Sequence, residues 1–285
     1  MKLLPFLDRI AAGSVPTASA PRRALLQQAG RTALAALPVA LGAAQPVAAR
    51  TKATPYDAIV QLLQLERLQM AFYSRALATT GLIPTAQAPD FTRMYDHQLQ
   101  HVAFLQSVLQ GAGSLVPAAP AFDFSGRKNV ATNPVLFPNV LSNYDDFLAL
   151  AQQLEDLGAR LYNALAFANT FDPQLARVLL QMLAVEGEHA AHVRGLRRDR
   201  GATVKTWPSS TDAPIARPAA AQVLTQTATG GEDNISQLAS AGVPIVFSSF
   251  LSVFKLSFVS DASLAEAFDE PVDANVAQAA LDLFS

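Results

Sequence analysis

The sequence predicts an all-α protein built around a four-helix bundle with one long crossover connection. Residues 56–198 contain four long segments in which apolar residues recur with helical spacing. The four segments form two similar hairpins, and a proline- and glycine-rich connection at residues 111–142 separates the hairpins. A connection of this length can run back along a helix of about 20 residues, which is about 30 Å long. Two hairpins joined in this way make a bundle with a single crossover.

The first hairpin is expected at residues 56–77 and 90–109. The segment YDAIVQLLQLERLQMAFYSRAL is amphipathic and stops near Gly81, and DFTRMYDHQLQHVAFLQSVL stops at Gly111-Ala112-Gly113. The connection that follows holds four prolines and three glycines, which predict irregular structure.

The second hairpin is expected at residues 143–168 and 172–198. Its second segment begins with Asp172, a suitable N-cap, and with Pro173 in the first turn. After this hairpin, a proline- and alanine-rich extension continues to the end of the chain.

The two hairpins repeat each other in sequence. Glu155 follows Glu66 by 89 residues, and Glu186 follows Gln98 by 88 residues. Matching histidines lie three residues after Gln98 and Glu186, and matching tyrosines lie seven residues after Glu66 and Glu155; these are His101, His189, Tyr73 and Tyr162. Chance matches of single residues would not all show nearly the same offset between the two hairpins.

Six polar residues are predicted to face the interior of the bundle. Residues three, four and seven apart share a helix face, and each of the six is surrounded at those spacings by apolar residues. The set is Glu66, Gln98, His101, Glu155, Glu186 and His189. Glu188 and His192 fall on a more polar flank, and His97 is also predicted to be lateral.

A bound metal would explain why these groups are buried. An ionised carboxylate costs several kcal/mol to bury unless it is paired or coordinates a metal. No lysine or arginine lies on the four inward stripes to provide that pairing. Three glutamates and two histidines therefore predict a cation site between the helices.

This pattern resembles the ferritin-like superfamily, over roughly residues 56–200. That family uses one glutamate from each of two helices and a Glu-x-x-His motif from each of the other two. The resemblance implies iron or manganese, as one or two ions, held by Glu66, Gln98, His101, Glu155, Glu186 and His189. Gln98 departs from the motif, because a neutral amide oxygen cannot balance charge or bridge two ions as a carboxylate does.

Three stretches resemble a narrower group, the exported bacterial ferritin-like proteins related to desiccation-associated proteins. These are LLQLERLQMAFYSRAL, HQLQHVAFL and FDEP, the last at residues 268–271. This resemblance implies the bundle and a metal site, without a settled activity.

Residues 1–49 are predicted to be an export leader. Arg22-Arg23 precedes a short apolar run at 33–44 and small residues at 46–49. This order is typical of a twin-arginine export signal and predicts a periplasmic protein. A disordered alanine-rich leader is the alternative interpretation.

The rest of the chain divides at about residue 204. We expect the bundle at 50–204 and, at 205–285, an extension that packs on it and ends in a helix at 273–284 capped by Asp273. The apolar segment 243–259 contains Lys255 and four serines, so it is expected to pack against protein rather than to span a membrane.

Composition excludes several function classes. The chain has no cysteine, which rules out disulfides, iron–sulfur clusters, thiol catalysis and cysteine-ligated zinc. A net charge of −2 gives no basic surface for nucleic acid.

Two functions fit the sequence. One is a metal-binding, redox or stress-protective protein of the cell envelope, and the other is a structural desiccation-stress protein that keeps the bundle without using a metal. The sequence leaves open whether the protein is an enzyme and whether it forms a homo-oligomer.

Overall fold

The computed structural model describes residues 55–168, 172–229, 232, 236–238, 244–246 and 260–285. The predicted leader and most of the apolar segment 243–259 lie outside these residues.

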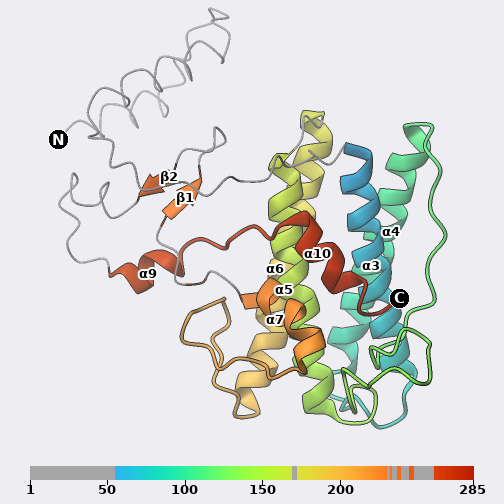
Figure 1. The fold of residues 1–285 in the computed structure, drawn as a ribbon, viewed down its shortest axis with the longest axis vertical. Helices are drawn as coiled ribbons and strands as arrows, with labels where there is room; N and C mark the ends of the chain where they lie inside the picture. Colours follow the sequence, from blue (N-terminus) through green and yellow to red (C-terminus); the bar gives the residue numbers. More distant parts are fainter. Residues whose placement is uncertain (1–54, 169–171, 230–231, 233–235, 239–243, 247–259) are drawn as a thin grey trace, which may run out of the picture. The chain divides into compact units, whose positions relative to one another are not determined.

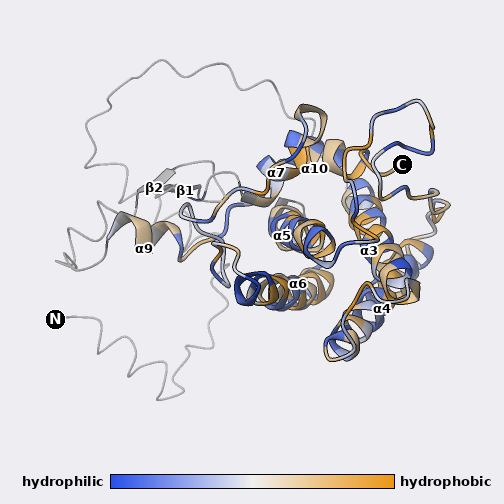
Figure 2. Cartoon of the chain, turned by 90° about the horizontal axis from the view of Figure 1, so that it is seen from below, coloured by the Kyte–Doolittle hydropathy of each residue, from blue (hydrophilic) through white to orange (hydrophobic). Residues whose placement is uncertain are grey.

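Four long helices form the bundle (Figure 1), which confirms the predicted fold class. They are α3 (Pro55–Ala78), α4 (Ala88–Gly111), α5 (Tyr144–Ala168) and α6 (Pro173–Asp199). Figure 2 shows the four helices nearly end-on. Each of them begins and ends within two residues of its predicted bounds.

Local sequence signals account for the helix ends. The Asp172 carboxylate caps α6 by accepting a hydrogen bond from the backbone N–H of Gln174 at 2.8 Å, as predicted. The Asn143 side chain does the same for α5, accepting from the N–H groups of Asp145 and Asp146. Such a cap is worth about 1 kcal/mol.

The crossover between α4 and α5 runs back along the outside of the bundle, so that the two helices point the same way (Figure 1). Hydrogen bonds attach this crossover to α3 and to the C-terminal end of the chain. Arg67 on α3 donates to the carbonyl of Pro117 at 2.7 Å, and the N–H of Asp123 donates to the carbonyl of Phe284 at 2.8 Å. Phe137 also stacks on Phe284, with ring centroids 4.9 Å apart.

The core is made of the apolar stripes that the periodicity predicts. Leucines of α3 and α5 are fully buried, and an aromatic group fills one end of the bundle. Phe147 is at the centre of this group, with ring centroids 5.2 Å from Phe72 and 5.1 Å from Phe91. Each such pair adds about 0.5–1.5 kcal/mol beyond its buried area.

The extension contains more regular structure than predicted. The terminal helix is present as α10 (Ala274–Leu281), and the Asp273 carboxylate caps it by accepting from the N–H of Asn275 at 2.9 Å. The additional elements are a 3₁₀ turn, η1 (Ala219–Ala221), two helices, α7 (Gln222–Thr229) and α9 (Asp261–Ala265), and two short antiparallel strands, β1 (Ser236–Leu238) and β2 (Pro244–Val246).

Helix α7 was missed because its sequence is short and its stability depends on tertiary contacts. An isolated helix of eight residues is unstable in water. Helix α7 packs against α5 and α10, and α10 also contacts α3 (Figure 2). Leu224 and Ala228 of α7 are completely buried as a result.

Two buried arginines lie on helix faces turned away from the inward stripes. Arg194 of α6 pairs with Asp156 of α5 at 2.7 Å and with Asp212 of the extension at 2.6 Å. Arg160 of α5 donates to the backbone carbonyls of Thr227 and Glu270 at 3.0 and 2.7 Å. Both guanidinium groups therefore tie the extension to the bundle, and neither belongs to the six-residue set.

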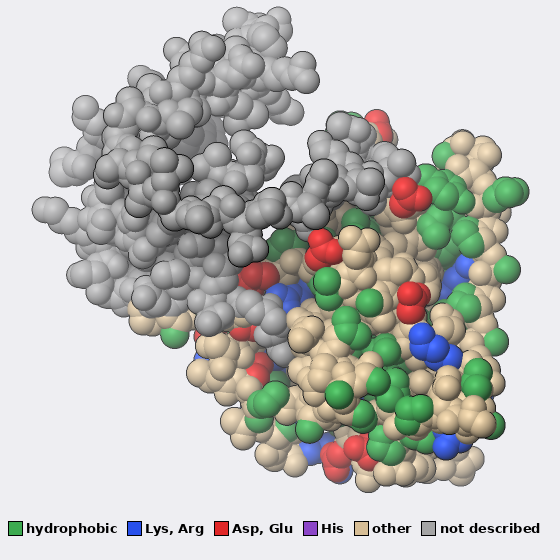
Figure 3. Space-filling view, in the orientation of Figure 1, with side chains coloured by type: hydrophobic (Ala, Val, Ile, Leu, Met, Phe, Trp, Pro, Cys, Tyr) green, Lys and Arg blue, Asp and Glu red, His purple; other side chains and the backbone are tan. Residues whose placement is uncertain are grey.

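No helix within the described residues is long and apolar enough to cross a bilayer. On the face shown in Figure 3, acidic and basic side chains are scattered among apolar and neutral ones, without a large patch of one sign.

Candidate metal centre

The six predicted residues meet in the middle of the bundle. Each helix contributes at least one of them: α3 gives Glu66, α4 gives Gln98 and His101, α5 gives Glu155, and α6 gives Glu186 and His189. Glu66, Gln98, Glu155 and Glu186 have no solvent exposure, and the two histidine side chains are at most 11% exposed.

Glu186 lies at the centre of the group. Its Oε1 is 3.5 Å from His101 Nδ1, 3.8 Å from His189 Nδ1 and 3.3 Å from Gln98 Nε2. His101 Nδ1 also lies 3.2 Å from Glu66, and His189 Nδ1 lies 3.3 Å from Glu155.

Two overlapping sets of three residues follow from these distances. In each set the carboxylate oxygens and imidazole nitrogen lie within 4.8 Å of one another. The sets are Glu66–His101–Glu186 and Glu155–Glu186–His189. Because Glu186 belongs to both, its carboxylate can serve two neighbouring cations.

Two buried tyrosines hold the terminal glutamates from the opposite hairpin. The Tyr73 hydroxyl of α3 donates to Glu155 of α5, and the Tyr162 hydroxyl of α5 donates to Glu66 of α3. These tyrosines belong to the sequence repeat, but helix periodicity alone does not predict that they contact the glutamates. Their seven-residue spacing after each glutamate was the available signal.

Glu186 is positioned by a glutamine and a glycine that sequence reasoning did not assign to the site. Gln69 Nε2 donates to Glu186 Oε2 at 2.9 Å and to the Leu154 carbonyl at 3.2 Å. The same carboxylate oxygen lies against Gly158 of α5, where an added Cβ would overlap it. Gly158 therefore leaves space for the carboxylate that both sets share.

His97 lies beside the six-residue group, as its lateral position predicts, but it makes a contact with that group that helix periodicity does not predict. His97 is half-buried, and its Nδ1 lies 3.0 Å from His189 Nε2 with the two rings stacked 11° from parallel. The imidazole is long enough to reach around the flank of α4 to α6. Glu188 is exposed, and His192 lies 3.5 Å from Asp90, both outside the six-residue group.

The pKa values of the buried acids and histidines are shifted, because their charges lie close together and away from solvent. Burial, and then repulsion by Glu186, raise the pKa of Glu66 and of Glu155 to about 7. Burial alone would lower the pKa of His101, but its hydrogen bonds to Glu186 and Glu66 raise it to about 10. Burial opposes the ionisation of Glu186, and the hydrogen bond and charges of the histidines nevertheless hold its pKa below the ordinary value.

A divalent cation fits the donors that are present. Within the described residues, the buried Oε1 of Gln98 and Oε2 of Glu155 have no hydrogen-bond partner, and a hard cation can satisfy buried oxygen atoms of this kind. Gln98 turns its Nε2, not its Oε1, toward Glu186. Carboxylate oxygens and imidazole nitrogens are ligands for divalent metal ions.

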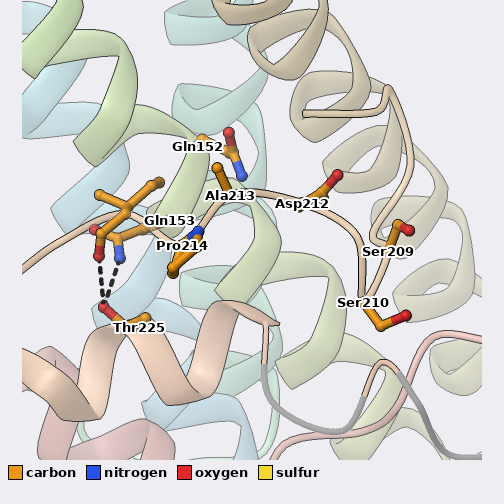
Figure 4. Close-up of a pocket in the computed structure, with 9 residues that line it drawn as sticks. Gln152, Gln153, Ser209, Ser210, Asp212, Ala213, Pro214 and Thr225 are labelled. Carbon is orange, nitrogen blue, oxygen red and sulfur yellow. Dashed lines mark hydrogen bonds between the residues drawn. The ribbon is translucent and has the colours of Figure 1, made fainter. Parts of the chain in front are cut away.

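Other polar features lie away from this centre. A hollow of about 80 Å³ lies where α5 meets the loop 209–215 and α7 (Figure 4), and there Gln153 Nε2 donates to Thr225 Oγ1 at 3.1 Å. A further acidic group surrounds Arg160 on the extension side of α5; it consists of Glu232, Asp269 and Glu270.

The comparison with protein families agrees with the geometry. A family model described as "Ferritin-like domain" matches residues 57–199, which is half of the chain and spans all four bundle helices. No curated protein matches the chain. The match does not address the narrower desiccation-related group. The chain therefore belongs to the family of ferritin-like domain proteins, and its bundle holds buried acidic and histidine groups that could bind a metal.

Proposed function

We propose that this protein binds one or two iron or manganese ions at the centre of its bundle. The observation that carries the proposal is the convergence of three fully buried glutamates and two histidine Nδ1 atoms from four helices, with Glu186 shared by both halves. Uncompensated carboxylates in such a place would be costly, and a divalent cation removes that cost.

In this proposal each half of the centre has its own terminal ligands. Glu66 and His101 would hold one ion, Glu155 and His189 would hold the other, and Glu186 would be available to both. Gln98 stands where the family has a glutamate, and it would offer a neutral oxygen once its amide turns over, because its Nε2 now faces Glu186. Three carboxylates with two divalent ions leave a net charge of +1, so a second ion is bound more weakly than it would be with four carboxylates.

The residues around the ligands keep them in place. The tyrosine hydroxyls orient the two terminal glutamates, and Gln69 orients Glu186. A bound iron or manganese pair would supply redox chemistry, and the chain's own contribution is to bind it, to fix its ligands and to keep water away.

A comparison of two alanine variants tests the metal centre. Glu155→Ala removes a buried ligand, whereas Glu188→Ala removes an exposed carboxylate from α6, two residues from the bridge. After metal-replete expression, elemental mass spectrometry should show a large loss of bound metal in the first variant only. Equal losses in two variants with equal helix content by circular dichroism would contradict the assignment. Less than about a tenth of an equivalent in the parent chain would favour a structural protein instead.

That structural role is the second candidate, and Gln98 is the observation that favours it. Replacing a carboxylate by an amide lowers the charge available for metal, and the bundle could persist in a desiccation-stress protein that no longer uses the ion.

We further propose that the protein acts outside the cytoplasm, in stress protection of the cell envelope. The basic pair at Arg22-Arg23, the apolar run and the small residues at 46–49 support export. Mass spectrometry of the protein recovered from its native cell envelope should give an N-terminus near residues 45–50. An intact Met1 on the abundant species would contradict a cleaved leader.

A further inference from the structure

The outer nitrogen of one proposed ligand has a partner from another helix. His189 of α6 directs its Nδ1 toward Glu155 and Glu186, at 3.3 and 3.8 Å, and its Nε2 lies 3.0 Å from Nδ1 of His97 on α4. The ring centroids are 5.2 Å apart. His97 itself is half-buried and belongs to neither set of three residues.

This arrangement gives the N–H of His189 an acceptor once Nδ1 binds a cation. A neutral imidazole has one N–H and one lone pair, so coordination through Nδ1 leaves the hydrogen on Nε2. At 3.0 Å that N–H donates to Nδ1 of His97, whose own hydrogen is then on its Nε2. The contact thus holds the ring in one orientation and gives the tautomer that coordination requires an acceptor for its N–H.

The other half of the centre lacks an equivalent partner. His101 also directs Nδ1 toward its carboxylates, Glu66 and Glu186. Within the described residues its Nε2 has no hydrogen bond to a side chain. The 88-residue offset that relates Gln98 to Glu186 places Val185 at the position of His97, and valine has no hydrogen-bonding side chain.

We propose that His97 is a positioning residue for His189, and that it makes the Glu155–His189 half of the centre the one that binds the first ion. The proposal rests on the proposed metal centre. A hydrogen-bonded partner on the outer nitrogen of a ligating histidine fixes the ring and increases its basicity, and losing such a partner commonly costs about 10–100-fold in metal affinity. The two halves have the same set of terminal ligand types, so this support is what distinguishes them.

Calorimetric titration of the full chain with Mn²⁺ tests the affinity. His97→Val, which copies the residue of the other half, should weaken the first binding step about 10-fold or more. His97→Gln keeps an acceptor oxygen and should restore most of that loss. His192→Val is the matched control, because His192 is a histidine on the flank of α6 that pairs with Asp90, and its binding curve should match that of the parent.

Nuclear magnetic resonance identifies the half that is filled and the tautomer of its ligand. The chain has four histidines, so their ring ¹⁵N signals can be assigned by substitution. With one equivalent of the diamagnetic ion Zn²⁺, the Nδ1 signal of His189 should shift before that of His101, and His189 should retain a slowly exchanging Nε2–H that is lost in His97→Val.

The outcomes separate this inference from the function on which it rests. If the parent binds neither ion, the metal centre itself is refuted. If the parent binds metal while His97→Val binds it equally well, or if His101 is filled first, the role of His97 is refuted and the metal centre stands. Equal weakening by His97→Val and His97→Gln would also refute it, because the acceptor would then not matter.

Discussion

Replacing Gly158 by alanine should destabilise this protein, although the same change usually stabilises a helix. In an exposed helix interior, alanine is better than glycine by about 1 kcal/mol. Gly158 lies inside α5, but a Cβ there would overlap Glu186 Oε2 and would come within 3.1 Å of Gln69 Nε2. Neither neighbour can move into solvent, because both side chains are completely buried.

The cost can be worked out from the contacts that would be disturbed. Overpacking of a core costs about 1–3 kcal/mol. The hydrogen bond from Gln69 to the Glu186 carboxylate, 2.9 Å long, is of the kind worth about 1.5–3 kcal/mol. After subtraction of the gain in helix propensity, we expect a net loss of about 1.5–5 kcal/mol, which lowers Tm by on the order of 10 °C for a domain of this size. Metal binding should fall as well, because Glu186 belongs to both halves of the centre.

Gly187→Ala is the matched control. Gly187 lies inside α6, one residue from Glu186, and an added Cβ there meets nothing within 4 Å. Melting curves followed by circular dichroism should show a higher Tm than the parent for Gly187→Ala and a lower one for Gly158→Ala. If Gly158→Ala also raised Tm and bound as much metal as the parent, the packing of Glu186 against α5 would be wrong.

Two further predictions concern buried charge. Gln98→Glu should lower the stability of the metal-free protein, because a fourth buried acid adds repulsion. The variant should bind more iron or manganese than the parent, and added metal should raise its Tm by more. An equal metal-dependent shift of Tm in both proteins would place Gln98 outside the metal centre. Burial raises the pKa of Glu232 to about 8; the charge of Arg160 opposes this shift, and repulsion by Asp269 and Glu270 adds to it. Above the ordinary pKa of a glutamate, the folded state therefore keeps a proton that the unfolded state releases. The unfolding free energy should therefore fall between about pH 5 and pH 8, and less so in Glu232→Gln, as urea titrations at several pH values would show; the same slope in both proteins would contradict the burial of this carboxyl group.

The sequence was sufficient to predict the bundle and the residues at its centre. Helix periodicity is a local property, and the polar residues that repeat at 88 to 89 residues lie within apolar stripes, which predicts that they share the interior. For this reason the helix bounds and the convergence of Glu66, Glu155 and Glu186 could be stated before any coordinates were known. That these residues bind a metal remains a prediction.

The contacts around those ligands could not be predicted, because they join helices that are far apart in the chain. Periodicity assigns a residue to a face of its own helix but does not say how far its side chain reaches into a neighbour. His97 was therefore assigned to a flank, although its ring meets His189 across the bundle. The hydrogen bonds of Tyr73 and Tyr162 to glutamates of the opposite hairpin could not be predicted for the same reason. The contact of Glu186 with Gly158 also joins two different helices.

What the sequence alone determined is the set of elements and the chemistry they carry: four amphipathic helices, two hairpins, and an inward group of acids, imidazoles and one amide. Only the tertiary structure decided that the Glu186 carboxylate is shared by both sets of residues and that the two sets differ at the outer nitrogen of their histidines. It also decided that Arg160 and Arg194 hold the extension on the bundle instead of neutralising the glutamates. The physical reason is that the identity of each side chain and the helical period are local properties of the sequence. Distances between side chains of different helices depend instead on how the helices pack.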